Sequence, residues 1–220
     1  MLRKILSLDS NFKDKRKTPL IQKIDDSVYI VENFLPSFHE NVLEEVFLSE
    51  KILTWTKSEN IAFAEDRVEY SKDGVRIGYA HVMADDETPF PYPRSEAFHF
   101  VFPMVASAFD CIGKEVKNFV TSRAFLTEPL YSDTEPVHID LVDKHWTCLY
   151  YPHTIDGDTV FMKEFYPEVL MEDVKTHEFH EFHRVSPKKG RCVLFDGYRY
   201  HCSYRSASKN RVVINCNVVI

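Results

Sequence analysis

Hydrophobic and polar positions follow a helical period in the first half of the chain and a period of two in the second half. A strand-like run at 28–35 leads into the first helical pattern. The apolar positions of that pattern are Val42, Leu43, Val46 and Phe47. Ser37 and Glu40 have the spacing of a capping box, so we expect these two side chains to cap the start of this helix.

A second amphipathic helix is predicted near 95–110, with Ser95 as its N-cap. Its apolar side is formed by Phe98, Val101, Phe102, Val105 and Phe109. Pro103 is expected to kink this helix or to mark a later start. Between the two helices, a DG turn within 67–83 predicts a β-hairpin, and the three prolines of 88–94 predict an extended connection.

From residue 118 onward the sequence breaks into eight short β-rich runs separated by turn signals. The runs are NFVTSRAFL, PVHIDL, HWTCLYY, DTVFMKEF, KTHEFHEFHRV, GRCVLFD, YRYHCSYR and RVVINCNVVI. A series of this kind is typical of a sandwich, a barrel or a jelly roll. We therefore expect a mainly β (α+β) protein.

The last run shows how these strands are used. Alternation places Arg211, Asn215 and Asn217 on one face of the strand. The opposite face is apolar and carries Val212, Ile214, Cys216 and Val218. This pattern predicts a sheet with the two helices packed behind it and a polar cavity in front.

Length and charge narrow the function classes. The 220 residues are expected to form a single domain over 1–220, with a basic arm at 1–20, a helical support and lid region at 28–117, and a β-rich core at 118–220. Because 27 Lys+Arg face 34 Asp+Glu, the formal charge of −7 disfavours nucleic acid as a partner, and the basic arm is expected to be solvated.

The five cysteines include no CxxC pair and are expected to be free thiols of a reducing compartment. The N-terminus lacks the features of a signal peptide, and the longest apolar run, 98–109, is too short to cross a bilayer. We therefore expect a cytoplasmic protein without a membrane partner. Its oligomeric state cannot be read from the sequence.

The segment HEFHEFH at 177–183 is the most conspicuous candidate for a metal site. On a strand, His177 and His183 would share a face while His180 would oppose them, and the outer pair would be far apart. Its neighbours are strand-like, so we interpret it as a histidine-rich strand on a solvated face rather than as a metal centre.

The quieter stretch PVHIDLVDKHW offers a better metal site. His138 and Asp140, two positions apart on a strand, project the same way, and His201 supplies a third ligand from a later strand. Each residue alone is more commonly structural. Together, two histidines and one carboxylate form the facial triad of non-haem Fe(II) oxygenases. Arg211, on the polar face of the last strand, adds a guanidinium suited to a carboxylate.

With these residues in place, the sequence resembles the 2-oxoglutarate and Fe(II)-dependent dioxygenases, in particular the prolyl-hydroxylase-like branch. The resemblance runs from HIDLVDKHWTCLYYPHTIDGDTVF through GRCVLFDGYRYH to RVVINCNVV, and includes the opening VYIVENFLPSFHENVLEEVF. It implies a double-stranded β-helix, the cupin-like jelly roll, with N-terminal helices packed on the major sheet.

The resemblance also implies roles for individual residues. His138, Asp140 and His201 would bind Fe(II), and Arg211 would bind the distal carboxylate of 2-oxoglutarate with help from Tyr151. Thr147 and Leu149 would share the wall of that cavity. The implied reaction uses O₂, releases succinate and CO₂ and hydroxylates a C–H bond, and ascorbate can take part as a further cofactor.

Two positions depart from the family pattern. Val213 stands where Ser or Thr is frequent, which removes one polar contact to 2-oxoglutarate, and the turn is Gly157–Asp158 rather than two glycines. Neither change removes a metal ligand. Retention of Asp140 argues against a halogenase, which lacks this carboxylate.

Several functions remain open at the level of sequence. The leading hypothesis is a hydroxylase acting on a protein side chain, such as proline, or on a small molecule. The alternatives are a nucleic-acid demethylase with the same iron chemistry, a catalytically silent jelly-roll binding module, and a metal-binding cupin, whose pattern favours HxH over HxD. The substrate is not encoded in a readable motif. Loops at 57–95 and 153–176 are expected to set specificity, with 57–67 and the hairpin after it as the lid.

Overall fold

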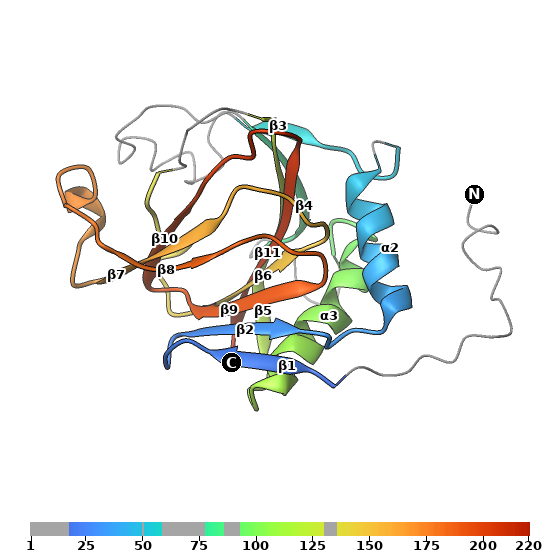
Figure 1. Cartoon of the computed structure of the whole chain (residues 1–220), viewed down its shortest axis with the longest axis horizontal. Coiled ribbons are helices and arrows are strands. Elements are labelled where there is room, and N and C mark those ends of the chain that lie inside the picture. The colour runs from blue at the N-terminus through green and yellow to red at the C-terminus, as the bar shows by residue number, and fades with distance from the viewer. Residues whose placement is uncertain (1–17, 50, 59–77, 86–92, 130–135) are drawn as a thin grey trace, which may run out of the picture.

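Two antiparallel β-sheets lie face to face and form a jelly roll (Figure 1). The structure, a computed structural model, describes residues 18–49, 51–58, 78–85, 93–129 and 136–220. The larger sheet has the strand order β1-β2-β9-β6-β11-β5-β4-β3, and the smaller has the order β10-β7-β8. The predicted mainly β fold is confirmed.

The strands are β1 (Leu20–Lys23), β2 (Val28–Glu32), β3 (Thr56–Ser58), β4 (Gly78–Ala84), β5 (Asn118–Thr127), β6 (Trp146–Tyr151), β7 (Thr159–Phe165), β8 (Glu181–Val185), β9 (Arg191–Asp196), β10 (Arg199–Ser203) and β11 (Arg211–Val219). A short 3-10 helix, η2 (Met171–Asp173), follows β7. Because β11 lies between β6 and β5, its polar face is central to the larger sheet.

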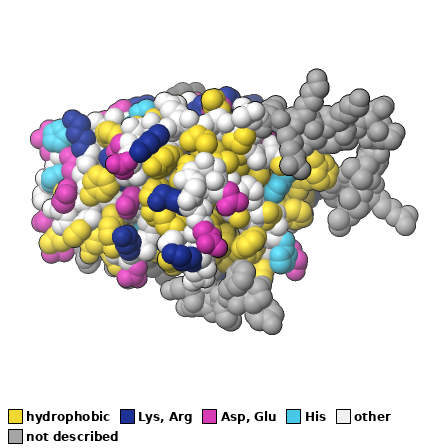
Figure 2. Space-filling view, turned by 90° about the horizontal axis from the view of Figure 1, so that it is seen from below, with side chains coloured by type: hydrophobic (Ala, Val, Ile, Leu, Met, Phe, Trp, Pro, Cys, Tyr) yellow, Lys and Arg dark blue, Asp and Glu magenta, His cyan; other side chains and the backbone are white. Residues whose placement is uncertain are grey.

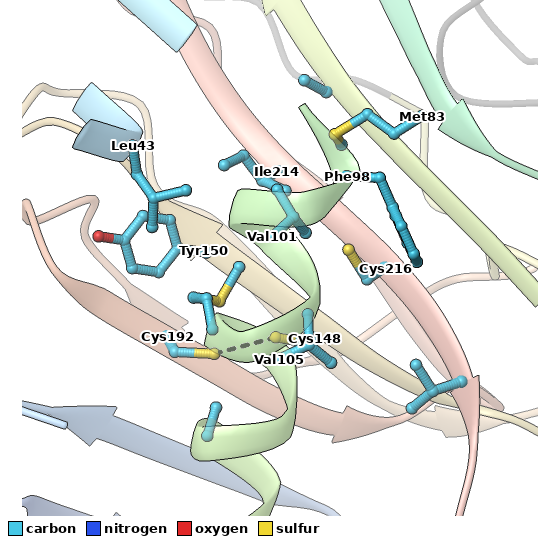
Figure 3. Packing of buried hydrophobic residues seen from close by; sticks show 14 of the residues in the cluster. Leu43, Met83, Phe98, Val101, Val105, Cys148, Tyr150, Cys192, Ile214 and Cys216 are labelled. Atoms are coloured by element: carbon cyan, nitrogen blue, oxygen red, sulfur yellow. Dashed lines mark hydrogen bonds between the residues drawn. The ribbon is translucent and has the colours of Figure 1, made fainter. Parts of the chain in front are cut away.

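The two helices, α2 (Ser37–Leu48) and α3 (Phe98–Cys111), cover the outer face of the larger sheet (Figure 1). Figure 3 shows Val101 and Val105 of α3 packed over Cys148, Ile214 and Cys216 of the sheet. All of these side chains are fully buried, which stabilises the contact by removing apolar surface from water. The predicted helical layer behind the sheet is confirmed.

A second apolar layer lies between the two sheets. Leu149, Tyr151 and Val213 of the larger sheet pack there with Phe161 and Val185 of the smaller one. The alternation predicted for the last strand is confirmed, since Val212, Ile214, Cys216 and Val218 belong to the helix-covered core. The other face of β11 is thereby free to line a cavity.

Several predicted elements differ from the structure. PVHIDL is not a strand: His138 forms one isolated β-bridge with His201, and Asp140 lies in a bend. The strand predicted at 175–185 begins only at Glu181, after a turn. Strands β1 to β4, which precede residue 118, complete the larger sheet, so the region before 118 contributes more β-structure than its helical periodicity indicated.

The predicted helix starts were also wrong. The N-cap of α2 is Pro36, and no side chain caps it; α3 begins after Ala97, whose N–H donates to the Ser95 hydroxyl. Pro103 lies inside α3, which continues beyond it. Phe102 is 39% exposed, although its ring contacts Phe119. Local capping patterns did not fix these boundaries because packing against the sheet selected them.

The predicted hairpin at 67–83 lies mostly outside the described residues, and so does most of the connection at 88–94. Within the described part, β4 pairs with β3 and β5. The five cysteines are free thiols, and Figure 3 shows Cys148 and Cys192 with their sulfur atoms 3.3 Å apart. None of the described helices is both long enough and apolar enough to cross a membrane.

An ion pair with a buried guanidinium joins the two sheets near His201 of β10. The guanidinium of Arg199 is stacked between Phe165 and Phe182 and is 4% exposed. Its Nη2 donates to Asp25 Oδ2 at 2.6 Å and its Nε to Ser27 Oγ at 2.8 Å. It thus connects the β1–β2 turn to the strand that carries His201.

We expect Asp25→Asn to destabilise the protein by about 2 kcal/mol, because it leaves a buried guanidinium without its counter-charge. Urea unfolding measures the effect. The matched control is Asp26→Asn, since Asp26 is exposed and its ion pair with Lys23 lies at the surface. Equal midpoints for the two variants would contradict this account.

Candidate functional site

Two backbone hydrogen bonds bring the candidate metal ligands together. His138 N–H donates to the His201 carbonyl and His201 N–H donates to the His138 carbonyl, each at 2.9 Å. This single bridge places the two imidazole centroids 4.6 Å apart. Asp140 follows two residues after His138 and turns toward both rings, so the predicted convergence of these three side chains is confirmed.

The ligand atoms of the three side chains all lie within 4.8 Å of one another. Asp140 Oδ1 is 3.8 Å from His138 Nε2 and 3.7 Å from His201 Nε2. Each histidine has its Nδ1 near a backbone carbonyl: Pro136 at 2.8 Å for His138 and Arg199 at 3.2 Å for His201. With Nδ1–H donated in this way, Nε2 carries the lone pair that faces the cluster.

Electrostatics keep His201 and Asp140 in the forms that can bind a metal ion. Burial, reinforced by His138, lowers the pKa of His201 to about 4, so this imidazole is neutral at pH 7. Burial raises the pKa of Asp140, but His201, His138, His145 and the hydrogen bond from Asn215 outweigh it and lower the pKa overall. Asp140 Oδ1 and the Nε2 atoms of the two imidazoles therefore converge as three ligand atoms. This arrangement fits a divalent cation.

The second carboxylate oxygen of Asp140 is held from the sheet. Asp140 Oδ2 accepts hydrogen bonds from Asn215 Nδ2 and from the Thr147 hydroxyl, both at 3.1 Å. The Thr147 oxygen also lies 2.8 Å from Asn217 Oδ1, and its one proton can serve only one of these acceptors at a time. These contacts leave Oδ1 to face the histidines.

Aromatic rings fix the orientation of His201. The ring of Phe195 meets it edge-on at 4.9 Å, and the Phe161 ring lies 6.3 Å away. Phe161 and Phe195 also contact each other, at 4.9 Å between centroids. The imidazole therefore has little freedom to leave the cluster.

A cavity extends from the metal ligands to Arg211. Its described lining consists of Phe125, Thr127, His138, Asp140, Leu149, Thr159, His201, Cys202, Ser203, Arg211, Val213 and Asn215. Arg211 is buried, and its Nε donates to the Gly157 carbonyl at 2.8 Å while Nη2 donates to Thr159 Oγ1 at 3.0 Å. The Tyr151 hydroxyl donates to the same Thr159 oxygen at 2.8 Å.

Gly157 makes this end of the cavity possible. Its φ of +97° is in the left-handed region, and a Cβ there would lie 2.7 Å from the Tyr204 carbonyl and 3.1 Å from Arg211 Cδ. The arginine therefore packs against backbone that only glycine allows. Asp158, the departure in this turn, leaves that contact intact.

The residues predicted for the site differ in their position relative to the cavity. Leu149 and Arg211 line the same cavity as the three metal ligands, and so does Val213. Tyr151 lies behind Thr159, and Thr147 contacts Asp140 rather than lining the described cavity. The sequence reasoning missed Thr159 and the contact from Asn215, although Thr159 lies in the stretch HIDLVDKHWTCLYYPHTIDGDTVF that carries the family resemblance and Asn215 lies on the polar face of the last strand.

The histidine-rich segment is arranged differently. His180 Nδ1 is 2.9 Å from Glu164 Oε1, and His177 Nε2 is 3.9 Å from the same oxygen. His183 lies on β8 opposite Phe161. Among the described residues, the group of three whose ligand atoms converge is His138, Asp140 and His201. Glu164 holds two of the other histidines as a surface cluster.

We expect Asn215→Ala to weaken Mn(II) binding about 10- to 100-fold, because Asp140 loses one of the hydrogen bonds that orient it. Titration followed by the electron paramagnetic resonance of free Mn(II) measures the affinity. Asn210→Ala, an exposed change in the loop before β11, is the control and should bind Mn(II) like the wild type. Unchanged affinity in Asn215→Ala would show that this amide does not position the carboxylate.

Comparison with known proteins gives a fold-level relationship. No protein-family model and no curated protein sequence matches this chain. Among solved structures, a 2OG-Fe(II) oxygenase-family oxidoreductase from Burkholderia pseudomallei is similar with a TM-score of 0.58 and 9% identity, covering 87% of this chain and 85% of that one.

Two further structures extend the comparison. A prolyl hydroxylase from Trichoplax adhaerens, in complex with a hypoxia inducible factor peptide fragment, has a TM-score of 0.55 and 15% identity, over 88% of this chain and 83% of that one. The alpha-ketoglutarate-dependent epimerase SnoN of nogalamycin biosynthesis has a TM-score of 0.58 and 13% identity, over 88% and 78%. This chain therefore has the fold of the 2OG-Fe(II) oxygenases.

Proposed function

We propose that the protein is an Fe(II)- and 2-oxoglutarate-dependent dioxygenase that hydroxylates a protein side chain or a small molecule. One observation carries the proposal: a single cavity has three converging electron-pair donors at one end and a buried guanidinium at the other. A metal ion and a dicarboxylate fit those two ends. The solved structure of SnoN with Fe³⁺ and alpha ketoglutarate supports the same pairing in a protein of this fold.

His138 Nε2, His201 Nε2 and Asp140 Oδ1 would hold Fe(II) and leave its other positions open. When bound, the iron and 2-oxoglutarate supply the oxidation: R–H, 2-oxoglutarate and O₂ become R–OH, succinate and CO₂. The side chains of the protein would bind the iron and the cosubstrate, orient the metal ligands and limit the access of water to the cavity. Asn215 and Thr147 keep Asp140 turned toward the metal, and Phe161 and Phe195 keep His201 in place.

Arg211 and Thr159 would bind the distal carboxylate of 2-oxoglutarate. The Thr159 oxygen accepts from Tyr151 and from Arg211, which directs its own proton elsewhere, toward a carboxylate in the cavity. This hydroxyl offers the polar contact that Val213 lacks. Tyr151 thus acts through Thr159, while Leu149, Val213 and Phe125 give the cavity apolar walls that limit water.

The alternatives have less support. Demethylation of nucleic acid would require a basic surface, but the formal charge is −7, and on the face shown in Figure 2 Lys and Arg lie among Asp and Glu. A silent binding module would not need a complete set of metal ligands with a buried arginine beside it. Hydroxylation therefore stays the preferred function.

The purified protein with Fe(II) and 2-oxoglutarate should form succinate slowly without added substrate, and Asp140→Ala should abolish this activity by removing a metal ligand. Succinate measured by mass spectrometry, with and without O₂, is the readout. His180→Ala, which changes the surface histidine cluster, is the control and should remain active. Succinate formation by Asp140→Ala equal to that of wild type would reject the proposed centre.

Arg211→Lys should raise the KM for 2-oxoglutarate by about tenfold or more, since an ammonium cannot reproduce the fork that holds Gly157, Thr159 and a carboxylate together. Initial rates over a range of 2-oxoglutarate concentrations give KM and kcat separately. Arg184→Lys changes an exposed arginine of β8 and provides the comparison. If the two variants have the same KM for 2-oxoglutarate, Arg211 does not bind the distal carboxylate of 2-oxoglutarate.

A further inference from the structure

A second arginine lies on the metal-facing side of the larger sheet, one strand away from the cavity. Arg123 of β5 is directly opposite Asn215 of β11 and opposite Val82 of β4. Residues directly opposite in an antiparallel pair project from the same face. Because Asn215 points at Asp140, Arg123 projects toward the metal side as well.

On the sides of β4 and of Phe125, the neighbours of Arg123 on that face are small or apolar. Phe125, two residues along β5, is opposite Val213 and Ala80 and lines the cavity. Ala80, Val82, Arg123 and Phe125 form a surface, here called the platform, and all four are half-buried. The platform is therefore an apolar floor with one guanidinium, and it continues into the cavity through Phe125 and Asn215.

The charge of Arg123 is not matched within the described part of the chain. Its Nε is buried and no acceptor reaches it, and no ion pair recorded between described residues includes Arg123. The other two arginines on inward-facing positions differ, because Arg199 donates to Asp25 and Ser27, and Arg211 to Gly157 and Thr159. A buried donor without an acceptor costs free energy unless a bound group supplies one.

The position of Arg123 separates it from the 2-oxoglutarate end of the cavity. Asn215 follows Arg211 by four residues on β11, which corresponds to about 13 Å along an extended strand, and β5 is offset by about 4.8 Å. Arg211 therefore lies along the strand from Asn215, the residue that holds Asp140, whereas Arg123 lies across the sheet from it. Two carboxylates held by these two arginines would belong to two different molecules.

We propose that Arg123 binds a carboxylate of the hydroxylated substrate, whose apolar body rests on Ala80, Val82 and Phe125. This inference rests on the proposed dioxygenase function and specifies its substrate class: a small molecule with a carboxylate on an apolar body. A single guanidinium on an apolar floor suits a monoanion, whereas a phosphate dianion is usually met by several donors. A carboxylate at Arg123 sets the adjoining C–H bonds over Asn215, toward Asp140.

The test uses matched acids and amides as substrates of the full-length protein loaded with Fe(II) and 2-oxoglutarate. N-acetyl amino acids, isovalerate and benzoate are compared with their carboxamides, and phenyl phosphate is added as the dianion. The readout is succinate formed above each protein's own substrate-free rate, resolved into KM and kcat. The wild type should prefer at least one acid over its amide by about tenfold or more in kcat/KM.

The preference should disappear in Arg123→Gln, through a higher KM for the acid with little change for the amide. A purely structural role would alter both compounds alike. Arg184→Gln, on the exposed part of β8, is the matched control and should keep the preference. If Arg123→Gln fails to fold in a thermal melt, Arg123→Lys provides the same comparison, with the preference reduced because the fork is lost.

The inference is overturned if acid and amide stimulate the wild type equally, if Arg123→Gln retains the preference, or if phenyl phosphate acts where no acid does. It is also overturned if no acid stimulates a wild type that forms succinate without substrate. A wild type that forms no succinate under any condition would reject the dioxygenase function first, so the two failures are distinguishable.

Discussion

Three side-chain ligand atoms meet at the centre of this molecule, and their convergence is the constraint that organises the rest. Asp140 Oδ1 lies 3.8 Å from His138 Nε2 and 3.7 Å from His201 Nε2, an arrangement that a cation between them would stabilise. Each is prevented from turning away, by a carbonyl on each Nδ1 and by Thr147 and Asn215 on Oδ2. A buried network of hydrogen bonds thus fixes the orientation of all three side chains.

Because side chains alternate along its strands, the larger sheet has one face that packs against the helices and one face that lines the cavity. Val212, Ile214 and Cys216 pack under the helices, while Arg211, Val213 and Asn215 face the cavity from the same strand. Apolar burial on one face thus fixes the backbone to which the polar side chains of the other face are attached. Arg199 performs a similar dual task, since its guanidinium joins the sheets and its carbonyl accepts from His201 Nδ1.

Three arginines whose side chains point between the two sheets differ in the hydrogen-bond acceptors around them, and this difference indicates what each guanidinium does. Each of the three guanidinium nitrogens of Arg199 donates a hydrogen bond to a protein acceptor, so this residue has a structural role. Arg211 lines the cavity and is held there by hydrogen bonds from Nε and Nη2. Arg123 has a buried Nε that no acceptor reaches in the described structure. Under the proposed function, the same side chain would serve as a cross-link, a cosubstrate anchor or a substrate contact, according to the acceptors that the fold places beside it.

The sequence by itself determined the alternation of the last strand, the helical layer and the three candidate metal ligands, because periodicity and donor chemistry are local properties. It misplaced the helix caps and read PVHIDL as a strand, since competition between local signals is settled by packing. The tertiary structure alone decided that Thr159 joins Arg211 to Tyr151, that Asn215 holds Asp140 and that Arg123 stands beside Asn215. These contacts depend on strand register between segments up to 92 residues apart, from Arg123 to Asn215, and no single segment encodes that register.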